Sequence, residues 1–169
     1  LANLSLVSNN FSQVSMYCDS AEKIIEKLFD TPIEQFGALE DNKNRYLGSS
    51  KQIQAELNFK LGNKKRMNGF LEQARIYYKK LPIELTGLLE ISAEMRFDLN
   101  DLGTAIDEIN EGLVLADRHG LSRQKEQLLK TKKKVLSKAG DEEGASKTNE
   151  LLLLINQEKV SSQNRNLLI

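Results

Sequence analysis

Residues 88–119 hold two amphipathic helical patterns separated by a short polar turn at residues 99–101. Apolar residues recur three and four positions apart on each side of the turn, which places them on one face of a helix. The turn is only long enough to reverse the chain, so the segment is predicted to form an antiparallel helical hairpin. One hairpin cannot bury its own apolar face, and neighbours of the same kind are therefore expected. The residues of the pattern are Leu88, Leu89, Ala93 and Phe97, then Leu102, Ala105, Ile106, Ile109 and Leu113.

The composition of the 169-residue chain supports an all-α fold. It has 40% hydrophobic residues, only 2 Pro and 10 Gly, and no alternating runs of β-branched residues. Lys plus Arg and Asp plus Glu both number 24, so the formal net charge is zero. A neutral chain has no overall field that favours nucleic acid or membranes, and electrostatic recognition is expected to be local.

Several function classes find no support in the sequence. One Cys18 and one His119 cannot form a zinc site from protein ligands alone, and Cys18 lies on an apolar helical stripe, where a buried structural thiol is expected. The apolar run at 151–155 is too short to span a membrane. No glycine-rich phosphate loop and no nucleophile beside a base is present, so we expect no enzyme activity and no cofactor. The chain begins at Leu1 without Met, which favours a fragment of a longer protein.

The remaining helices are expected from periodicity and capping residues. Residues 1–7 are expected to end a helix before a turn at Asn9 and Asn10. A polar stretch at 40–45 fits either a loop or an extended helix end, and this choice stays open. The expected helices are 11–29, a helix from Pro32 through Leu39, 53–61 after a cap at Ser49 and Ser50, 64–80, 123–138 after a cap at Ser122, and a last helix from 145.

Similar turns recur along the chain at 60–63, 98–101 and 138–141. Gly62 and Asn100 are 38 residues apart, and Asn100 and Gly140 are 40 apart, a period typical of helical solenoids. Matching inward positions follow each turn. These are Met67, Leu71 and Ala74, then Ala105, Ile109 and Gly112, then Ala145, Asn149 and Leu152.

Small residues recur at matching positions of the hairpins. They are Ala55 and Ala93 in the first helix of a hairpin, and Ala74, Ala105 and Ala145 in the second. In this pattern the chain resembles the tetratricopeptide repeat (TPR) family. The resemblance implies an all-α fold, an α-solenoid of antiparallel hairpins that forms a right-handed superhelix. A solenoid of generic helical pairs is the alternative. Under the resemblance, residues 1–169 form one domain. Its parts are a partial or first repeat (1–30), an irregular insert or extra helix (31–50), three repeats (51–81, 82–120 and 121–157) and a helical extension (158–169).

The resemblance is strongest to the TPR arrays of bacterial sensor and regulatory proteins. It implies a noncatalytic scaffold that binds a peptide or protein segment, as the sensor or regulatory domain of a larger signalling or transcription-regulating protein. A cytoplasmic location is expected, with a periplasmic sensor domain as the alternative. A different hypothesis is a structural oligomerisation module whose groove is filled by its own C-terminal helix or by a second copy. The spacing of Leu153, Val160 and Leu167 is a coiled-coil pattern that would suit such a homodimer.

Three rows of polar residues, each spaced one helical turn apart, are expected to face the groove. They are Gln52, Glu56 and Lys60; Glu90, Glu94 and Asp98; and Lys130, Lys134 and Lys138. The acidic and basic rows either neutralise each other in solvent or bind a partner. In the second case the lysines, with Lys133 nearby, would hold an acidic peptide or a terminal carboxylate. Binding of nucleic acid by residues 130–134 is not expected, because aromatic residues are not interleaved with the lysines.

Overall fold

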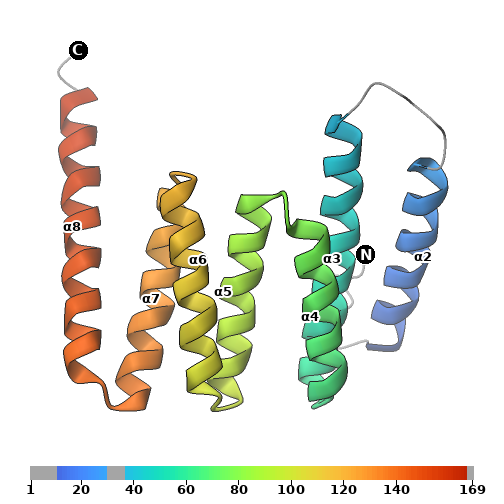
Figure 1. Cartoon of the computed structure of the whole chain (residues 1–169), viewed down its shortest axis with the longest axis horizontal. Helices are drawn as coiled ribbons and strands as arrows, with labels where there is room; N and C mark the ends of the chain where they lie inside the picture. The colour runs from blue at the N-terminus through green and yellow to red at the C-terminus, as the bar shows by residue number, and fades with distance from the viewer. Residues whose placement is uncertain (1–10, 30–36, 167–169) are drawn as a thin grey trace. The chain divides into compact units, whose positions relative to one another are not determined.

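The structure is a computed structural model that describes residues 11–29 and 37–166. Within these ranges the chain forms seven helices and no strand, so the all-α prediction is confirmed (Figure 1). The helices are α2 (Phe11–Phe29), α3 (Gly37–Lys60), α4 (Lys64–Tyr78), α5 (Pro82–Asp98), α6 (Leu102–Arg118), α7 (Ser122–Ala139) and α8 (Glu142–Asn166). The helix end expected at 1–7, the turn at Asn9 and Asn10, and the helix start at Pro32 fall outside the described residues.

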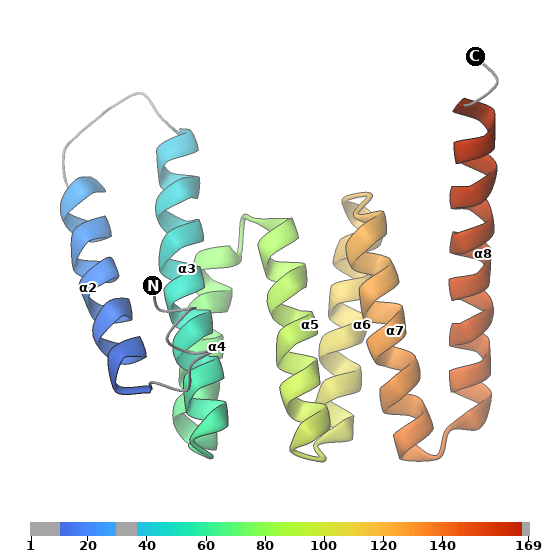
Figure 2. The same ribbon diagram turned by 180° about the vertical axis from the view of Figure 1, so that it is seen from behind.

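The contacts gather into two compact units, Leu1–Leu88 and Leu89–Ile169. The division falls within α5, and therefore inside the repeat expected at 82–120 rather than at its edge. In the first unit α2 packs against α3 and α3 against α4; in the second, α6 packs against α7 and α7 against α8. Both views show α2 beside α3 and α7 beside α8, each pair running in opposite directions (Figures 1 and 2).

Four tight turns end their helices in the same way. One residue of each turn has a positive φ, which is 60° at Asn100 and 79° at Gly140. The amide that follows this residue donates to the carbonyl five positions earlier, as in the Schellman motif. These bonds are Asn63 N to Asn58 O, Asp101 N to Arg96 O and Leu121 N to Ala116 O, each 2.8 Å, and Asp141 N to Leu136 O at 3.0 Å.

The helix expected to start after a cap at Ser49 and Ser50 does not exist as a separate element, because α3 runs unbroken from Gly37 to Lys60. The serine hydroxyl that the sequence assigned to capping has another partner: Ser50 Oγ donates to Glu22 Oε1 of α2 at 2.7 Å. Gly48 is also helical, and the space where its Cβ would lie is filled by the ring of Tyr78. The polar stretch at 40–45 is helical too, which resolves the alternative left open by the sequence.

Two other helix starts differ from expectation. The N-cap of α7 is Leu121, and Ser122 is its first helical residue. The last helix starts at Glu142 rather than at 145, because Asp141 Oδ1 accepts the amide of Gly144 at 2.9 Å. A side-chain oxygen of Asp or Ser at the N-cap position can accept a free amide of the helix's first turn in this way.

Each unit has its own apolar core. In the second unit, Ala93, Ala105, Ile109, Leu128 and Val135 are buried together, with Phe97, Leu102, Ile106 and Leu113 packed against them. In the first unit, Val14, Cys18 and Leu57 form a cluster with Phe11 and Ile53. The predicted burial of Cys18 is confirmed, and this burial is the main cause that raises the pKa of its thiol. Leu28, in the last turn of α2, is 66% exposed.

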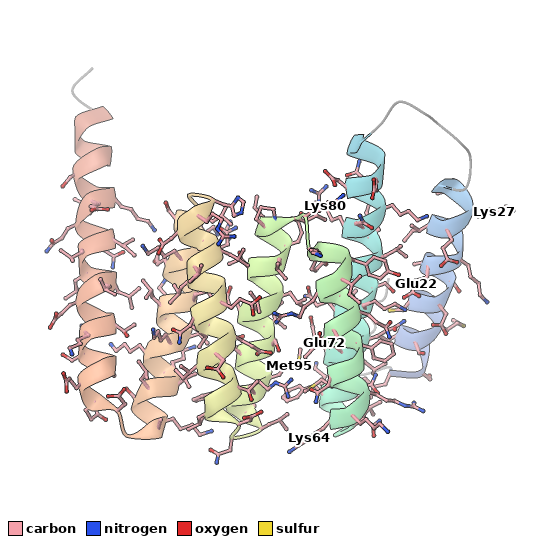
Figure 3. All side chains as sticks on the ribbon, viewed as in Figure 1. Glu22, Lys27, Lys64, Glu72, Lys80 and Met95 are labelled. Carbon is pink, nitrogen blue, oxygen red and sulfur yellow. The ribbon has the colours of Figure 1, made fainter. Side chains whose placement is uncertain are left out.

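A polar cluster joins α2 to α3 beside this core. Glu22 projects from α2 toward α3 (Figure 3), where Lys51 Nζ donates to its Oε2 at 2.7 Å and Gln54 Nε2 donates to its Oε1 at 3.2 Å. The side chains of Glu22 and Lys51 are 18% and 14% exposed, so this ion pair is mostly removed from solvent. Together with the bond from Ser50, one carboxylate therefore anchors three residues of α3.

Replacing Glu22 with Ala should destabilise the first unit by about 1–3 kcal/mol, because Lys51 loses its partner in a mostly buried setting. Glu26→Ala, one turn along the same helix at an exposed position, is the matched control and should change stability by less than about 0.5 kcal/mol. Urea denaturation followed by circular dichroism measures both. Equal stability of the two variants would show that the cluster does not hold α2 in place.

Candidate functional site

The strongest candidate site is a cleft of about 650 Å³ in the second unit, open to solvent. Its walls come from α5 and α7, with one residue from α8. The α5 wall is acidic and the α7 wall is rich in lysine. The lining residues are Glu90 and Glu94 from α5, Gln127, Lys130, Thr131, Lys133, Lys134 and Ser137 from α7, and Leu152 from α8.

The two walls follow from helical periodicity. On α5, Leu89 and Ala93 are buried in the core, and the next positions, Glu90 and Glu94, therefore lie at the edge of that buried face. On α7, the buried residues Leu128, Thr131 and Val135 set the inner face in the same way. The lysines at 130 and 134 flank it, one turn apart.

The structure brings together four of the nine residues predicted to line the groove: Glu90, Glu94, Lys130 and Lys134. Asp98 and Lys138 do not line the cleft. Lys138 is engaged elsewhere: its Nζ donates to the Phe97 carbonyl at 2.9 Å and lies 4.2 Å from the centre of the Phe97 ring. The other predicted row, Gln52, Glu56 and Lys60, belongs to the first unit, where Gln52 Nε2 donates to Glu56 Oε1 at 3.1 Å.

The uncharged part of the lining was not predicted from the sequence. Gln127 lies one turn before Lys130 on α7, Thr131 one turn before Lys134 and Ser137 one turn after Lys134, so helical spacing could have suggested them. Leu152 gave no such signal, because its place beside α7 depends on how two helices pack. It is only 8% exposed.

The lysines of the cleft differ in how far their charge is already matched. Lys130 Nζ contacts Glu126 Oε1 at 2.7 Å on its own helix, and Lys159 of α8 contacts the other oxygen of the same carboxylate. Hydrogen bonds from Lys130 and then Lys159 lower the pKa of Glu126 to about 2, so this carboxylate stays ionised. Lys133 Nζ donates to the neutral amide oxygen of Asn149 at 2.7 Å, which leaves its charge uncompensated.

Lys134 differs from the other lysines of α7. Each of the other five donates to or pairs with a described residue, whereas Lys134 has no ion pair or hydrogen bond within residues 11–29 and 37–166. The partners are Asp117 for Lys125, Glu126 for Lys130, Asn110 for Lys132, Asn149 for Lys133 and Phe97 for Lys138. Lys134 does act on Glu90 through space.

The acidic wall is not neutralised by the basic one. Neither Glu90 nor Glu94 forms an ion pair or a hydrogen bond with any residue in the described part of the chain. The pKa of Glu90 is raised, first by partial burial and then by repulsion from Glu94, and the opposing effects of Lys134 and Lys130 are smaller. The alternative in which the two rows simply cancel each other is therefore not what the geometry favours for Glu90.

Two other clefts are weaker candidates. One of about 510 Å³ lies between the α6–α7 turn and α8, and its main charged groups are already matched, with Lys125 Nζ 2.6 Å from Asp117 Oδ1. Another of about 320 Å³ lies in the first unit between α2, α3 and α4.

Among the described residues, no three His, Cys, Asp or Glu side chains are placed to share a metal ion. None of the described helices has both the length and the apolar character that crossing a membrane requires.

Comparison with known proteins adds no relative: no protein-family model matches the chain, and no curated protein is significantly similar to it. The site must therefore be interpreted from its own geometry.

Replacing Glu90 with Gln should stabilise the folded chain at neutral pH by roughly 0.2–0.5 kcal/mol, because it removes a like-charge pair one turn apart. The pKa of Glu90 is higher in the folded state than in the unfolded chain. Stability therefore falls as the pH rises from the unfolded pKa through the folded pKa of this carboxyl group. The gain from Glu90→Gln should therefore shrink as pH falls through the raised pKa. Glu150→Gln, at an exposed position of α8, is the control. Urea titrations at several pH values measure the effect, and a loss of stability at neutral pH would mean that Glu90 is already well matched.

Proposed function

We propose that this chain is a noncatalytic TPR-like module that binds a peptide segment of a partner protein in the cleft between α5 and α7. The observation that carries the proposal is the cleft itself, in which acidic and basic side chains from different helices face one space without pairing with each other. Partial burial and the charge of Glu94 disfavour the ionised form of Glu90, so a partner that supplies positive charge there gains more than it would at a fully solvated carboxylate.

The repeated hairpin supports the TPR-like part of the proposal. The turns at Gly62, Asn100 and Gly140 share positive φ values and the same helix-ending hydrogen bond. Eight of the nine positions that follow the turns at equal spacing are also buried, and the ninth, Asn149, is partly exposed. The buried positions are Met67, Leu71 and Ala74 after the first turn, Ala105, Ile109 and Gly112 after the second, and Ala145 and Leu152 after the third.

The cleft is better suited to binding than to catalysis. It offers carboxylates and amines together with the hydroxyls of Thr131 and Ser137, and within the described residues neither hydroxyl is hydrogen-bonded to a side chain that could act as its base. Catalysis of group transfer needs a nucleophile, a base within hydrogen-bond reach and donors for the developing charge. The resemblance to bacterial regulatory TPR arrays further suggests that binding regulates a larger signalling or transcription-regulating protein.

A second candidate function, self-association through α8, is favoured by the apolar surface of that helix. Leu151, Leu153, Leu154 and Val160 are each 50–56% exposed, and within the described residues α8 packs only on α7. The described part of α8 does not fill the cleft, since Leu152 alone lines it. If a second copy covers this surface, the chain should be a dimer in solution.

Under that second candidate, Leu153→Lys combined with Val160→Lys should convert a dimer into a monomer, because two charges would be buried at the interface. Light scattering at several protein concentrations measures the mass. Gln13→Lys, at an exposed polar position of α2 and therefore away from α8, is the control and should leave the mass unchanged. A wild-type chain that is monomeric at all concentrations would rule out the candidate.

Filling the cleft with a bulky side chain should abolish peptide binding. Gln127 is exposed and lines the cleft, so Gln127→Trp blocks the space without changing any charge or the core. Peptides selected by display of a random library on the wild-type chain should bind the variant at least tenfold more weakly, which corresponds to about 1.4 kcal/mol. Isothermal titration calorimetry measures the dissociation constants.

Gln13→Trp, at an exposed position of α2, is the matched control and should bind the selected peptides as the wild type does. The proposal fails if the library yields no peptide that prefers this chain to an unrelated protein. It also fails if the selected peptides bind the Gln127→Trp variant with unchanged affinity.

A further inference from the structure

We infer that the segment bound in the cleft carries charges of both signs, with basic side chains on Glu90 and Glu94 and acidic side chains on Lys133 and Lys134. This inference rests on the proposed function, and it names the chemistry of the ligand. It also differs from the simpler expectation of a purely acidic peptide held by the row of lysines.

The acidic wall requires a cation. Glu90 and Glu94 are one turn apart on α5, so their carboxylates repel each other. Neither has a basic partner within hydrogen-bond distance among the residues that the structure describes. Partial burial of Glu90 strengthens the effect, because a carboxylate with less water around it gains more from a nearby cation. A Lys or Arg side chain between the two carboxylates would relieve both costs.

The basic wall can bind an anion through two of its lysines. Lys130 is held by Glu126, a carboxylate that it shares with Lys159, and Lys138 is held by Phe97 outside the cleft. Lys133 bonds a neutral amide, and Lys134 has neither an ion pair nor a hydrogen bond within the described ranges. The positive charge available to a ligand therefore lies on Lys133 and Lys134, rather than on the full row that sequence spacing predicted.

A segment with one sign of charge would meet repulsion from one wall. An acidic peptide on Lys134 would lie in the same cleft as Glu90 and Glu94, and a basic peptide on the carboxylates would lie near the lysines. Like charges placed together in an interface are strongly unfavourable, and this makes the cleft selective as well as attractive. Only a mixed-charge ligand satisfies both walls.

The arrangement also favours a peptide over a compact zwitterion. Glu90 and Glu94 are four residues apart, a rise of about 6 Å along the helix axis, so the acidic wall extends along the cleft. A free amino acid would reach one carboxylate and one lysine, whereas side chains along a segment can reach more. Because five of the nine lining residues are charged, binding of a charged segment should weaken with added salt.

Double-mutant cycles between the cleft and the library-selected peptides test the inference. Replacing the basic residues of a selected peptide with Gln should weaken binding to the wild-type chain about tenfold, and so should replacing its acidic residues. In the Glu90→Gln, Glu94→Gln variant the first change should become nearly neutral while the second stays costly. In the Lys133→Gln, Lys134→Gln variant the pattern should reverse.

Asp107→Gln with Glu111→Gln, two exposed acidic positions one turn apart on α6, is the control for the acidic wall and should leave both effects intact. Coupling to one wall only, or to neither, overturns the inference, as does full competition by the dipeptide Lys-Glu at the peptide's own concentration. In those cases, peptides that are still blocked by Gln127→Trp would leave the proposed function standing. Loss of the Gln127→Trp effect would remove both.

Discussion

The hydrogen bond that ends each helix at a tight turn determines most of this architecture. At four turns an amide donates to the carbonyl five residues earlier, across a residue with positive φ. The residue that donates this amide also accepts, through its carbonyl, the first hydrogen bond of the next helix. Asp101 O, for example, accepts from Ala105 N at 3.1 Å. One residue thus closes one helix and opens the next, so the chain must reverse within about three residues. Successive helices then lie side by side and antiparallel.

This reversal explains how the cleft is built. Within the second unit, α6 packs against both α5 and α7 and reverses direction between them, so α5 and α7 run the same way. Close packing depends on small residues of α6: a Cβ at Gly112 would lie 2.8 Å from Leu128 Cδ1 of α7. Because both helices present residues spaced by one turn to the same space, the charged rows of α5 and α7 become two walls of one cleft.

Local chemistry explains what the sequence could predict. Asn100 and Gly140 tolerate a left-handed conformation, so the turns were recognisable without any tertiary information. The start of α3 was not, because Ser49 and Ser50 look like caps, whereas the hydroxyl of Ser50 bonds Glu22 from another helix. A long-range partner decided that segment. No local sequence pattern indicates such a partner.

The same limit applies to the cleft. Helical spacing placed Glu90, Glu94, Lys130 and Lys134 on suitable faces, and these four do line one cleft. Helical spacing could not show which charges remain available to a ligand, since a long lysine side chain can reach any of several acceptors. Five lysines of α7 form a hydrogen bond or an ion pair with a neighbouring residue, and Lys134 forms neither within the described residues. Lys134 therefore keeps its ammonium group exposed at the cleft. The cost lies on the opposite wall, where partial burial and repulsion from Glu94 disfavour the charge of Glu90, and a basic group of an external segment can remove that cost.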